Sequence, residues 1–335
     1  MTIKDQNLSK LNFSFQKKLV YLAFILFVVK IAAWLITSSV AIYSDALESV
    51  VNIIGALIGL YSLYLTSIPL DKNHPYGHGK IEFLTSGLEG LLIIIAGVMI
   101  CIESFHKFLS KSELERIDYG IIIVLVTALI HLWIGLISLK KGKKYNSPVL
   151  YSGGKHLISD SYTTFGIVIG LVIVYFTHIY WIDSLIGMLL SLFLLFTGIL
   201  IIRKSIKGIM DEKDEKLMNE LIGYFEKSRR ECWIDLHHLR VQQYGPKLHI
   251  DVHLTLPFYF TVQQAHDEME MIQESINNYY HEKVDMSIHS DPCLSFSCEI
   301  CSISDCTFRK KAFVKRISWN LDNVSDNKKH HAEGE

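Results

Sequence analysis

Two groups of polar side chains with metal-ligand chemistry lie inside long apolar segments of this 335-residue chain. Asp45, Glu48 and Asn52 fall within about 60° of one another around a helix axis. His156 and Asp160 have i, i+4 spacing and therefore also share one face of a helix. Ionisable residues inside a membrane segment are costly, so they mark a functional site by default. We expect the two groups to form one metal-binding site within the bilayer.

The expected site would combine carboxylate, amide and imidazole ligands. Nitrogen and oxygen donors of this kind suit zinc and its neighbours among the first-row divalent metals. The alternative is a polar network that only holds helices together, as membrane bundles do use. Three carboxylates and a histidine carry more charge than helix association needs, which favours a metal site. Since metal binding requires neutral imidazole and ionised carboxylates, protons and metal would compete for it.

Hydropathy places these residues in a membrane protein. The chain is 50% apolar, and its mean hydropathy is +0.28. A helix needs about 20 residues to cross a hydrocarbon core. Six segments are long enough: 19–36, 39–65, 83–108, 119–139, 150–177 and 182–202. No cleavable signal is expected, because the first apolar run is itself of membrane length. A net charge of −1 offers no support for nucleic-acid binding.

Loop charges predict the orientation of these six segments. Lysines follow the fourth segment at 140, 141, 143 and 144, and Arg203, Lys204 and Lys207 follow the sixth. The loops after the first and fifth segments contain neither Lys nor Arg. By the positive-inside rule, both termini face the cytoplasm of a multi-pass protein in the cell (inner) membrane.

The polar remainder predicts a soluble domain after the sixth segment. Residues 211–228 and 261–280 are typical of helices, the second with Thr261 as its N-cap. Residues 235–243, 247–256 and 284–289 are typical of strands, and Gly245-Pro246 forms the turn between the first two. This αββαβ order suits an α+β sheet of the ferredoxin or metallochaperone type.

The polar loop after the second segment contains a further candidate site. Asp71, His74 and His78 have metal-ligand spacing, and Pro75 and Gly77 allow the backbone to turn tightly around them. The alternative is a loop-closing cap in which His78 binds only backbone.

Histidines on the predicted strands form another candidate site. His249 and His253 alternate on the polar face of the second strand, and His289 lies on the polar face of the third. Scattered, solvated histidines are the alternative interpretation.

Four of the six cysteines crowd together near the C-terminus, at Cys293, Cys298, Cys301 and Cys306. A reducing cytosol disfavours disulfides between them. A central C-x-x-C with two flanking thiols can form a tetrahedral zinc site. Spare thiols and redox pairing are the alternatives.

Four motifs make the chain resemble the cation diffusion facilitator (CDF) family. They are SDALESVVN at 44–52, HPYGHGK at 74–80, HLISD at 156–160 and IHSDP at 288–292. Their order and spacing cover roughly residues 15–295. The resemblance implies a homodimeric, six-span exporter that exchanges divalent metals for protons and is not an enzyme.

The resemblance also implies which residues bind metal in the membrane. The transport ligands would be Glu48, Asn52, His156 and Asp160, with Asp45 as a neighbour that substitutes or relays protons. Zinc exporters of the family carry Asp or His and then Asp in the second span, so Asn52 removes one negative charge here. His156 favours zinc, iron, cobalt, nickel or cadmium over manganese.

Outside the membrane, the resemblance implies a regulatory or delivery site at Asp71, His74 and His78. It also implies a binuclear site near the dimer interface, with ligands His237, His253, His266, His289 and Asp291. Strand alternation does not support His237, because that residue has the parity of Leu239 and Val241. The resemblance implies nothing for the four cysteines.

These observations together predict an efflux transporter for divalent transition metals that works as a metal/proton antiporter. Zinc is the first candidate for its substrate and regulator, and iron, cadmium, cobalt and nickel are alternatives. We expect a six-helix transport domain at 1–208, a cytoplasmic metal-binding and dimerisation domain at 209–308, and a flexible tail at 309–335. Two other classes stay open: a membrane-anchored metal sensor, and an intramembrane hydrolase in which the same metal activates water.

Overall fold

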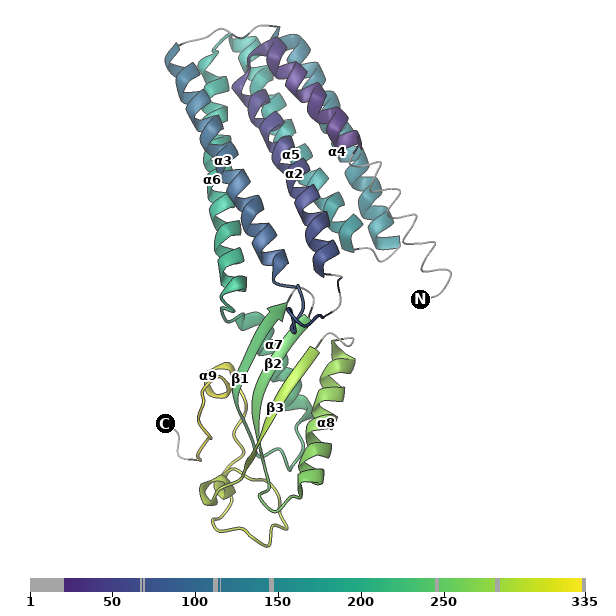
Figure 1. Cartoon of the computed structure of the whole chain (residues 1–335). Coiled ribbons are helices and arrows are strands. Elements are labelled where there is room, and N and C mark those ends of the chain that lie inside the picture. Colours follow the sequence, from purple (N-terminus) through teal and green to yellow (C-terminus); the bar gives the residue numbers. More distant parts are fainter. Residues whose placement is uncertain are drawn as a thin grey trace. The chain divides into compact units, whose positions relative to one another are not determined.

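The computed structural model describes residues 21–332 except 67, 69, 111–113, 115, 145–147, 245–246 and 281–283 (Figure 1). The expected polar N-terminus, the start of the first span and the Gly245-Pro246 turn lie outside the described residues. The chain divides into two compact units, one of residues 1–61 and 85–205 and the other of residues 62–84 and 206–335.

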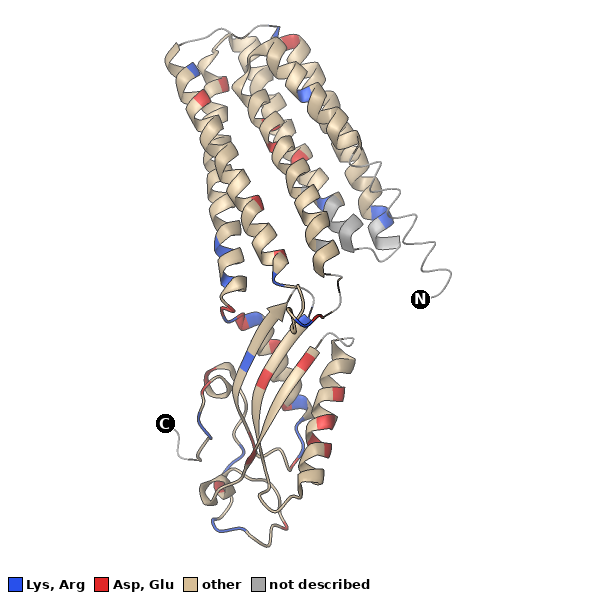
Figure 2. Ribbon diagram, in the orientation of Figure 1, with Lys and Arg blue, Asp and Glu red and all other residues tan. Residues whose placement is uncertain are grey.

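Long apolar helices form the first unit. After a helix at Tyr21–Thr37 come α2 (Val40–Thr66), α3 (Ile81–Ser110), α4 (Ile117–Lys144), α5 (Pro148–Thr177) and α6 (Trp181–Ile209). Within the described residues, α2 to α6 are long and apolar enough to cross a membrane, and Tyr21–Thr37 is a shorter apolar helix. Charged residues are sparse along these helices (Figure 2). The predicted helical membrane domain is confirmed.

Glycines allow two pairs of these helices to pack closely. A Cβ added at Gly135 on α4 would lie 3.1 Å from the carbonyl oxygen of Gly154 on α5. A Cβ added at Gly198 on α6 would lie 2.8 Å from the carbonyl oxygen of Gly90 on α3. Small residues at helix interfaces let backbones approach in lipid, where packing drives association. The contact with α4 therefore positions α5, the helix that carries Asp160.

A carboxylate on α6 binds the N-terminus of α2. Asp183 accepts hydrogen bonds from the Ser39 hydroxyl at 2.6 Å and from the Val40 N–H at 2.7 Å. The first N–H groups of a helix have no partner within the helix, and a negative charge is favourable there. Asp183 is itself only 1% exposed. This buried contact fixes the start of the helix that carries Glu48.

The second unit contains a three-stranded sheet and the helices around it. Its elements are α7 (Glu215–Ser228), β1 (Asp235–Tyr244), β2 (Lys247–Leu256), α8 (Val262–Tyr279) and β3 (Val284–Pro292). The order in the sheet is β1-β2-β3, with β1 antiparallel and β3 parallel to β2. The predicted αββαβ domain is confirmed.

Capping side chains set where both helices of this unit begin. Thr261 is the N-cap of α8, as predicted, and forms a reciprocal capping box with Gln264. Helix α7 begins at Glu215 rather than 211, because the Asp214 carboxylate accepts the N–H groups of Lys216 and Leu217.

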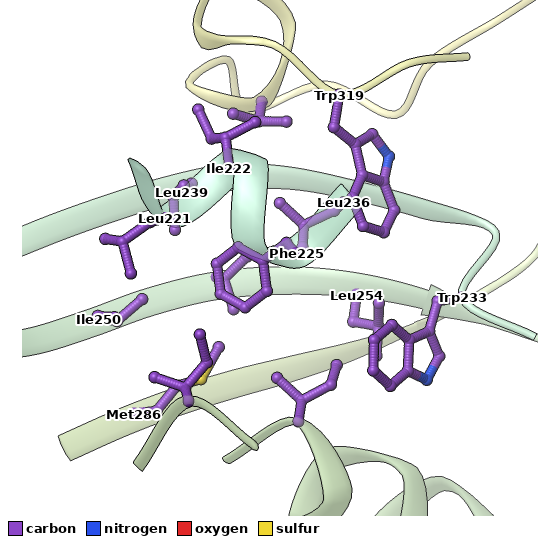
Figure 3. Packing of buried hydrophobic residues seen from close by; sticks show 14 of the residues in the cluster. Leu221, Ile222, Phe225, Trp233, Leu236, Leu239, Ile250, Leu254, Met286 and Trp319 are labelled. Carbon is purple, nitrogen blue, oxygen red and sulfur yellow. The ribbon is translucent and has the colours of Figure 1, made fainter. Parts of the chain in front are cut away.

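Residues after 308 pack against the domain, which corrects the expectation of a flexible tail. They include the short helix α9 (Leu321–Val324). Trp319 and Val324 are 5% and 0% exposed and belong to the same apolar core as Phe225 and Leu236 (Figure 3). The Arg229 guanidinium lies 3.9 Å from the centroid of the Trp319 ring. The tail resembled a solvated segment because its charged residues outnumber its apolar ones.

The loop between α2 and α3 belongs to the second unit rather than to the expected transport domain at 1–208. The Tyr76 ring lies 5.8 Å from that of Tyr244 and 5.2 Å from that of His249. Lys80 forms an ion pair with Asp211 at 2.8 Å. These contacts connect the loop to β1, β2 and the segment before α7.

Candidate metal sites

The two ligand groups expected in the membrane meet at Asp160. The Asn52 side-chain amide on α2 donates a hydrogen bond of 3.0 Å to Oδ2 of Asp160 on α5. Nε2 of His156 lies 3.7 Å from the same oxygen. Glu48, one helical turn before Asn52, interacts electrostatically with Asp160. An amide, an imidazole and two carboxylates are thereby brought to one region of the bundle.

Asp45 has a different environment from the other acidic residues of this region. Lys30 donates to its Oδ1 at 2.9 Å, and the two side chains are 2% and 3% exposed. The Thr164 hydroxyl donates to the same oxygen at 2.8 Å. Asp45 is therefore part of a buried ion pair, and its negative charge is compensated within the protein.

The second expected site forms in the loop between α2 and α3. Ligand atoms of Asp71, His74 and His78 all lie within 4.8 Å of one another. The backbone N–H of His74 donates to the Asp71 carboxylate at 2.7 Å, and this bond is the main reason that the pKa of Asp71 is lowered. Gly77, at φ +85°, supplies the backbone turn between the two histidines. Ionised carboxylate and adjacent imidazoles suit a divalent cation.

The third expected site lies across all three strands of the sheet. His237 is paired with His253, which in turn is paired with His289. Asp291 Oδ2 is 3.3 Å from Nε2 of His237 and 3.3 Å from Nδ1 of His253. His289 Nε2 is 4.0 Å from the other oxygen of Asp291. Burial is the main reason that the pKa of His237 is lowered, which favours the neutral imidazole that binds metal.

A β-bulge explains why strand alternation predicted the wrong face of the sheet for His237. The register of β1 shifts between His237 and Arg240, and His238 has a φ of +54°. An extra residue in a strand reverses the alternation of side chains beyond it. His237 therefore lies on the same face as its cross-strand partner His253, whereas Leu239 packs in the apolar core.

His266, the remaining expected ligand of the sheet site, lies apart from it. It sits on α8, is 62% exposed, and its Nε2 is 3.9 Å from Glu270. Among the described residues, the cluster of ligand atoms within 4.8 Å comprises His237, His253 and Asp291.

Two residues of the C-terminal segment contact the sheet site, and the sequence did not reveal them. The ring Nδ1 of His330 forms a short contact with Asp235. The backbone N–H of His330 also donates a hydrogen bond of 2.9 Å to the same carboxylate. Asp235 is in turn 3.6 Å from His237. Lys329 forms an ion pair with Asp291 at 3.3 Å. Lys329 and His330 of the C-terminal segment therefore contact the acidic groups beside this site.

The four cysteines expected to bind metal line one cavity of about 280 Å³. Cys301 is buried and the other three are partly buried. All four are free thiols, so redox pairing has no support in the structure.

Comparison with known proteins accounts for both units. Residues 19–210 match the family model of the cation efflux transmembrane domain, and residues 230–293 match that of the cation efflux protein cytoplasmic domain. The chain belongs to the cation efflux (CDF) family. It is a multi-pass membrane protein with a cytoplasmic C-terminal domain, and its substrates are divalent cations.

Curated relatives extend over most of the chain. An uncharacterised transporter, sll1263, from Synechocystis is 32% identical over 74% of this chain and 80% of its own length. The manganese efflux system protein MneP of Bacillus subtilis is 22% identical over 78% and 90%. The cation-efflux pump FieF of Shewanella oneidensis is 23% identical over 81% and 90%. Cation efflux proteins are transporters and not enzymes, which removes the hydrolase alternative.

Proposed function

We propose that this chain is a metal/proton antiporter that exports a divalent transition metal from the cytoplasm, with zinc as the preferred substrate. Its transport ligands are Glu48, Asn52, His156 and Asp160. The observation that carries the proposal is the convergence of amide and imidazole on one oxygen of Asp160, from two helices of the bundle. The mixed nitrogen and oxygen donors favour zinc, iron or cobalt over a hard cation such as magnesium.

Charge balance supports a divalent substrate. Because Lys30 compensates Asp45, the carboxylates of Glu48 and Asp160 supply the negative charge of the site. Two carboxylates match the charge of one divalent cation, and neutral Asn52 adds a ligand oxygen without adding charge. The substitution of a carboxylate by Asn52 is thus consistent with a site that already contains two.

Proton exchange follows from the same ligands. When the metal leaves, protons can neutralise the carboxylates and His156, and when protons leave, the metal can bind again. The His156 side chain is 55% exposed and that of Asp160 13%, so the imidazole is the more accessible of the two proton-binding groups in the isolated chain. Alternating access of this site to the two sides of the membrane would then couple metal export to proton entry.

The cytoplasmic clusters provide regulation in this proposal. The loop site at Asp71 and the sheet site at Asp291 bind metal on the cytoplasmic side, where both termini also lie. The matched cytoplasmic domain supports a homodimer, and the cell (inner) membrane is the expected location. Metal occupancy of these sites would report the cytoplasmic metal level to the transport domain.

Flux through liposomes tests the proposal. Purified protein would be reconstituted, and zinc uptake would be followed with an entrapped zinc-sensitive dye, with and without an imposed pH gradient. We expect zinc uptake to be faster when the liposome interior is more acidic than the outside, because protons then leave as zinc enters. Uptake should fall when this pH gradient is reversed. A rate of zinc uptake that does not depend on the pH gradient would contradict proton exchange. The absence of any zinc uptake would favour a membrane-anchored sensor.

A further inference from the structure

The four-cysteine cavity lies at the point where this chain continues beyond the family domain. The cytoplasmic-domain match ends at residue 293, so three of the four thiols belong to the extension. Cys293 follows β3, Cys298 lies in the 3₁₀ helix η1 (Ser295–Glu299), and Cys301 and Cys306 lie in the loop after it. No function discussed above uses these residues.

Backbone N–H groups point at three of the four sulfurs. The N–H of Phe258 donates to Cys293 Sγ at 3.4 Å, and the N–H of Lys310 donates to Cys298 Sγ at 3.4 Å. Cys301 accepts a backbone hydrogen bond from Ile303. Hydrogen bonds of this kind orient metal-binding thiolates and stabilise their negative charge.

Arg309 fixes the backbone around the central C-x-x-C. Its guanidinium donates to the carbonyl oxygens of Cys298 at 2.8 Å and Cys301 at 3.0 Å. The positive charge also interacts electrostatically with Cys301. It therefore offsets part of the negative charge that thiolates at this position would carry.

The thiols lie in partly buried surroundings. Cys301 is buried and the other three are partly buried, and none of the four forms a disulfide. Phe258, Tyr259 and Phe308 also line the cavity. Such surroundings suit a structural metal better than thiol exchange.

We propose that Cys293, Cys298, Cys301 and Cys306 bind one zinc ion that fastens the C-terminal extension to the cytoplasmic domain. Each thiol releases its proton to solvent, and four thiolates complete the tetrahedral shell. Within the described chain, three ligand atoms approach within 4.8 Å only at the two histidine clusters. The four sulfurs line one cavity but are not clustered at that distance, so zinc binding would require them to move closer to one another.

The apolar packing beside the cavity shows what this zinc would stabilise. Ile234, Ile300, Cys301 and Ala332 form a small buried cluster that joins the residue before β1, the cysteine loop and the end of the extension. The same extension carries Lys329 and His330 to the sheet site. Zinc at the cysteines would hold those contacts in place.

Metal analysis of the full-length protein in detergent tests this site. We compare the wild type with the double variant Cys298→Ser/Cys301→Ser and with the control Cys232→Ser, whose thiol lies outside the cavity. The double variant should lose about one zinc per chain, whereas the control should not. After cobalt loading, the double variant should also lose the thiolate-to-cobalt charge-transfer bands.

Alkylation of the wild type gives a readout that does not depend on the folding of a variant. With zinc bound, the four cysteine peptides should resist iodoacetamide, and a chelator should make them reactive. Equal zinc content in wild type and double variant, or alkylation that the chelator does not change, would overturn the proposal. Iron with acid-labile sulfide in place of zinc would also overturn it.

Discussion

Asn52 and Asp160 are joined by a hydrogen bond of 3.0 Å that connects α2 with α5 across 108 residues of sequence. Because the amide nitrogen of Asn52 is the donor, its oxygen is left to act as a ligand. The bond thus orders a neutral ligand beside a charged one before metal arrives.

Asn52→Asp should strengthen metal binding at this site. The substitution replaces the donated hydrogen bond by a third carboxylate near Glu48 and Asp160, which increases attraction for a dication. We expect zinc affinity to rise about tenfold, equivalent to about 1.4 kcal/mol, and protons to compete more strongly. Zinc titrations at several pH values measure both effects, with Asn52→Ala as the variant that removes the ligand oxygen. Unchanged affinity in both variants would exclude Asn52 from the site.

The Lys30–Asp45 ion pair should contribute to stability rather than to metal ligation. Asp45→Asn or Lys30→Met alone leaves one buried charge without its partner, which costs about 3–5 kcal/mol. The double variant Lys30→Met/Asp45→Leu should recover much of that loss. Thermal unfolding in detergent measures all three. If the double variant is no more stable than either single variant, the pair has another role, such as proton transfer.

The His330–Asp235 pair should make the stability of the cytoplasmic domain depend on pH. Burial lowers the pKa of His330, but the hydrogen bond and charge of Asp235 outweigh it, so the net shift is upward from 6.5. The pKa of Asp235 is lowered, because contact with His330 outweighs burial. The contribution of His330 is therefore complete below pH 6.5 and is lost as pH rises through the raised value. We expect the free energy of unfolding of the cytoplasmic domain to fall by about 1–2 kcal/mol as pH rises over that range.

Unfolding of wild type and His330→Asn between pH 5 and pH 9 measures this contribution. The variant should be less stable at low pH and should approach the wild type at high pH. His331→Asn is the matched control, because His331 stacks on Phe296 instead of contacting Asp235. If His330→Asn loses the same stability at every pH, His330 contributes through packing and not through its charge.

Lys329 should compete with metal at the sheet site. Its ammonium group lies 3.3 Å from Asp291, the carboxylate that also contacts His237 and His253. Lys329→Ala removes this positive charge, so zinc affinity of the site should rise several-fold, by about 1 kcal/mol. Calorimetric zinc titration measures the change, with Lys328→Ala as the neighbouring control. Equal effects of the two substitutions would indicate a general change in net charge.

Local patterns predicted the elements well, because apolar run length and strand alternation are properties of neighbouring residues. The six helical segments and the αββαβ order came from this signal. Loop motifs also predicted the cluster at Asp71, His74 and His78, whose ligands are only a few residues apart. For the same reason, the faces shared by Glu48 with Asn52 and by His156 with Asp160 were visible in the sequence.

Contacts over long sequence distances were not predictable in the same way. Nothing local shows that Lys30 pairs with Asp45, or that Asp183 caps a helix that begins 143 residues earlier. The bulge after His237 reverses strand alternation through one residue of positive φ. Trp319 likewise packs against core residues such as Phe225 and Leu236, which lie more than 80 residues earlier in the sequence.

Zinc flux by Asp160→Ala in liposomes is the most direct test of the transport site, because two of the other three ligands, Asn52 and His156, contact Asp160. Ser159→Ala, an exposed neighbour on the same helix, is the matched control, and folding of both is checked by thermal unfolding. We predict that Asp160→Ala abolishes zinc flux while remaining folded, and that Ser159→Ala transports like the wild type. Wild-type flux in folded Asp160→Ala would contradict the assignment of the transport site.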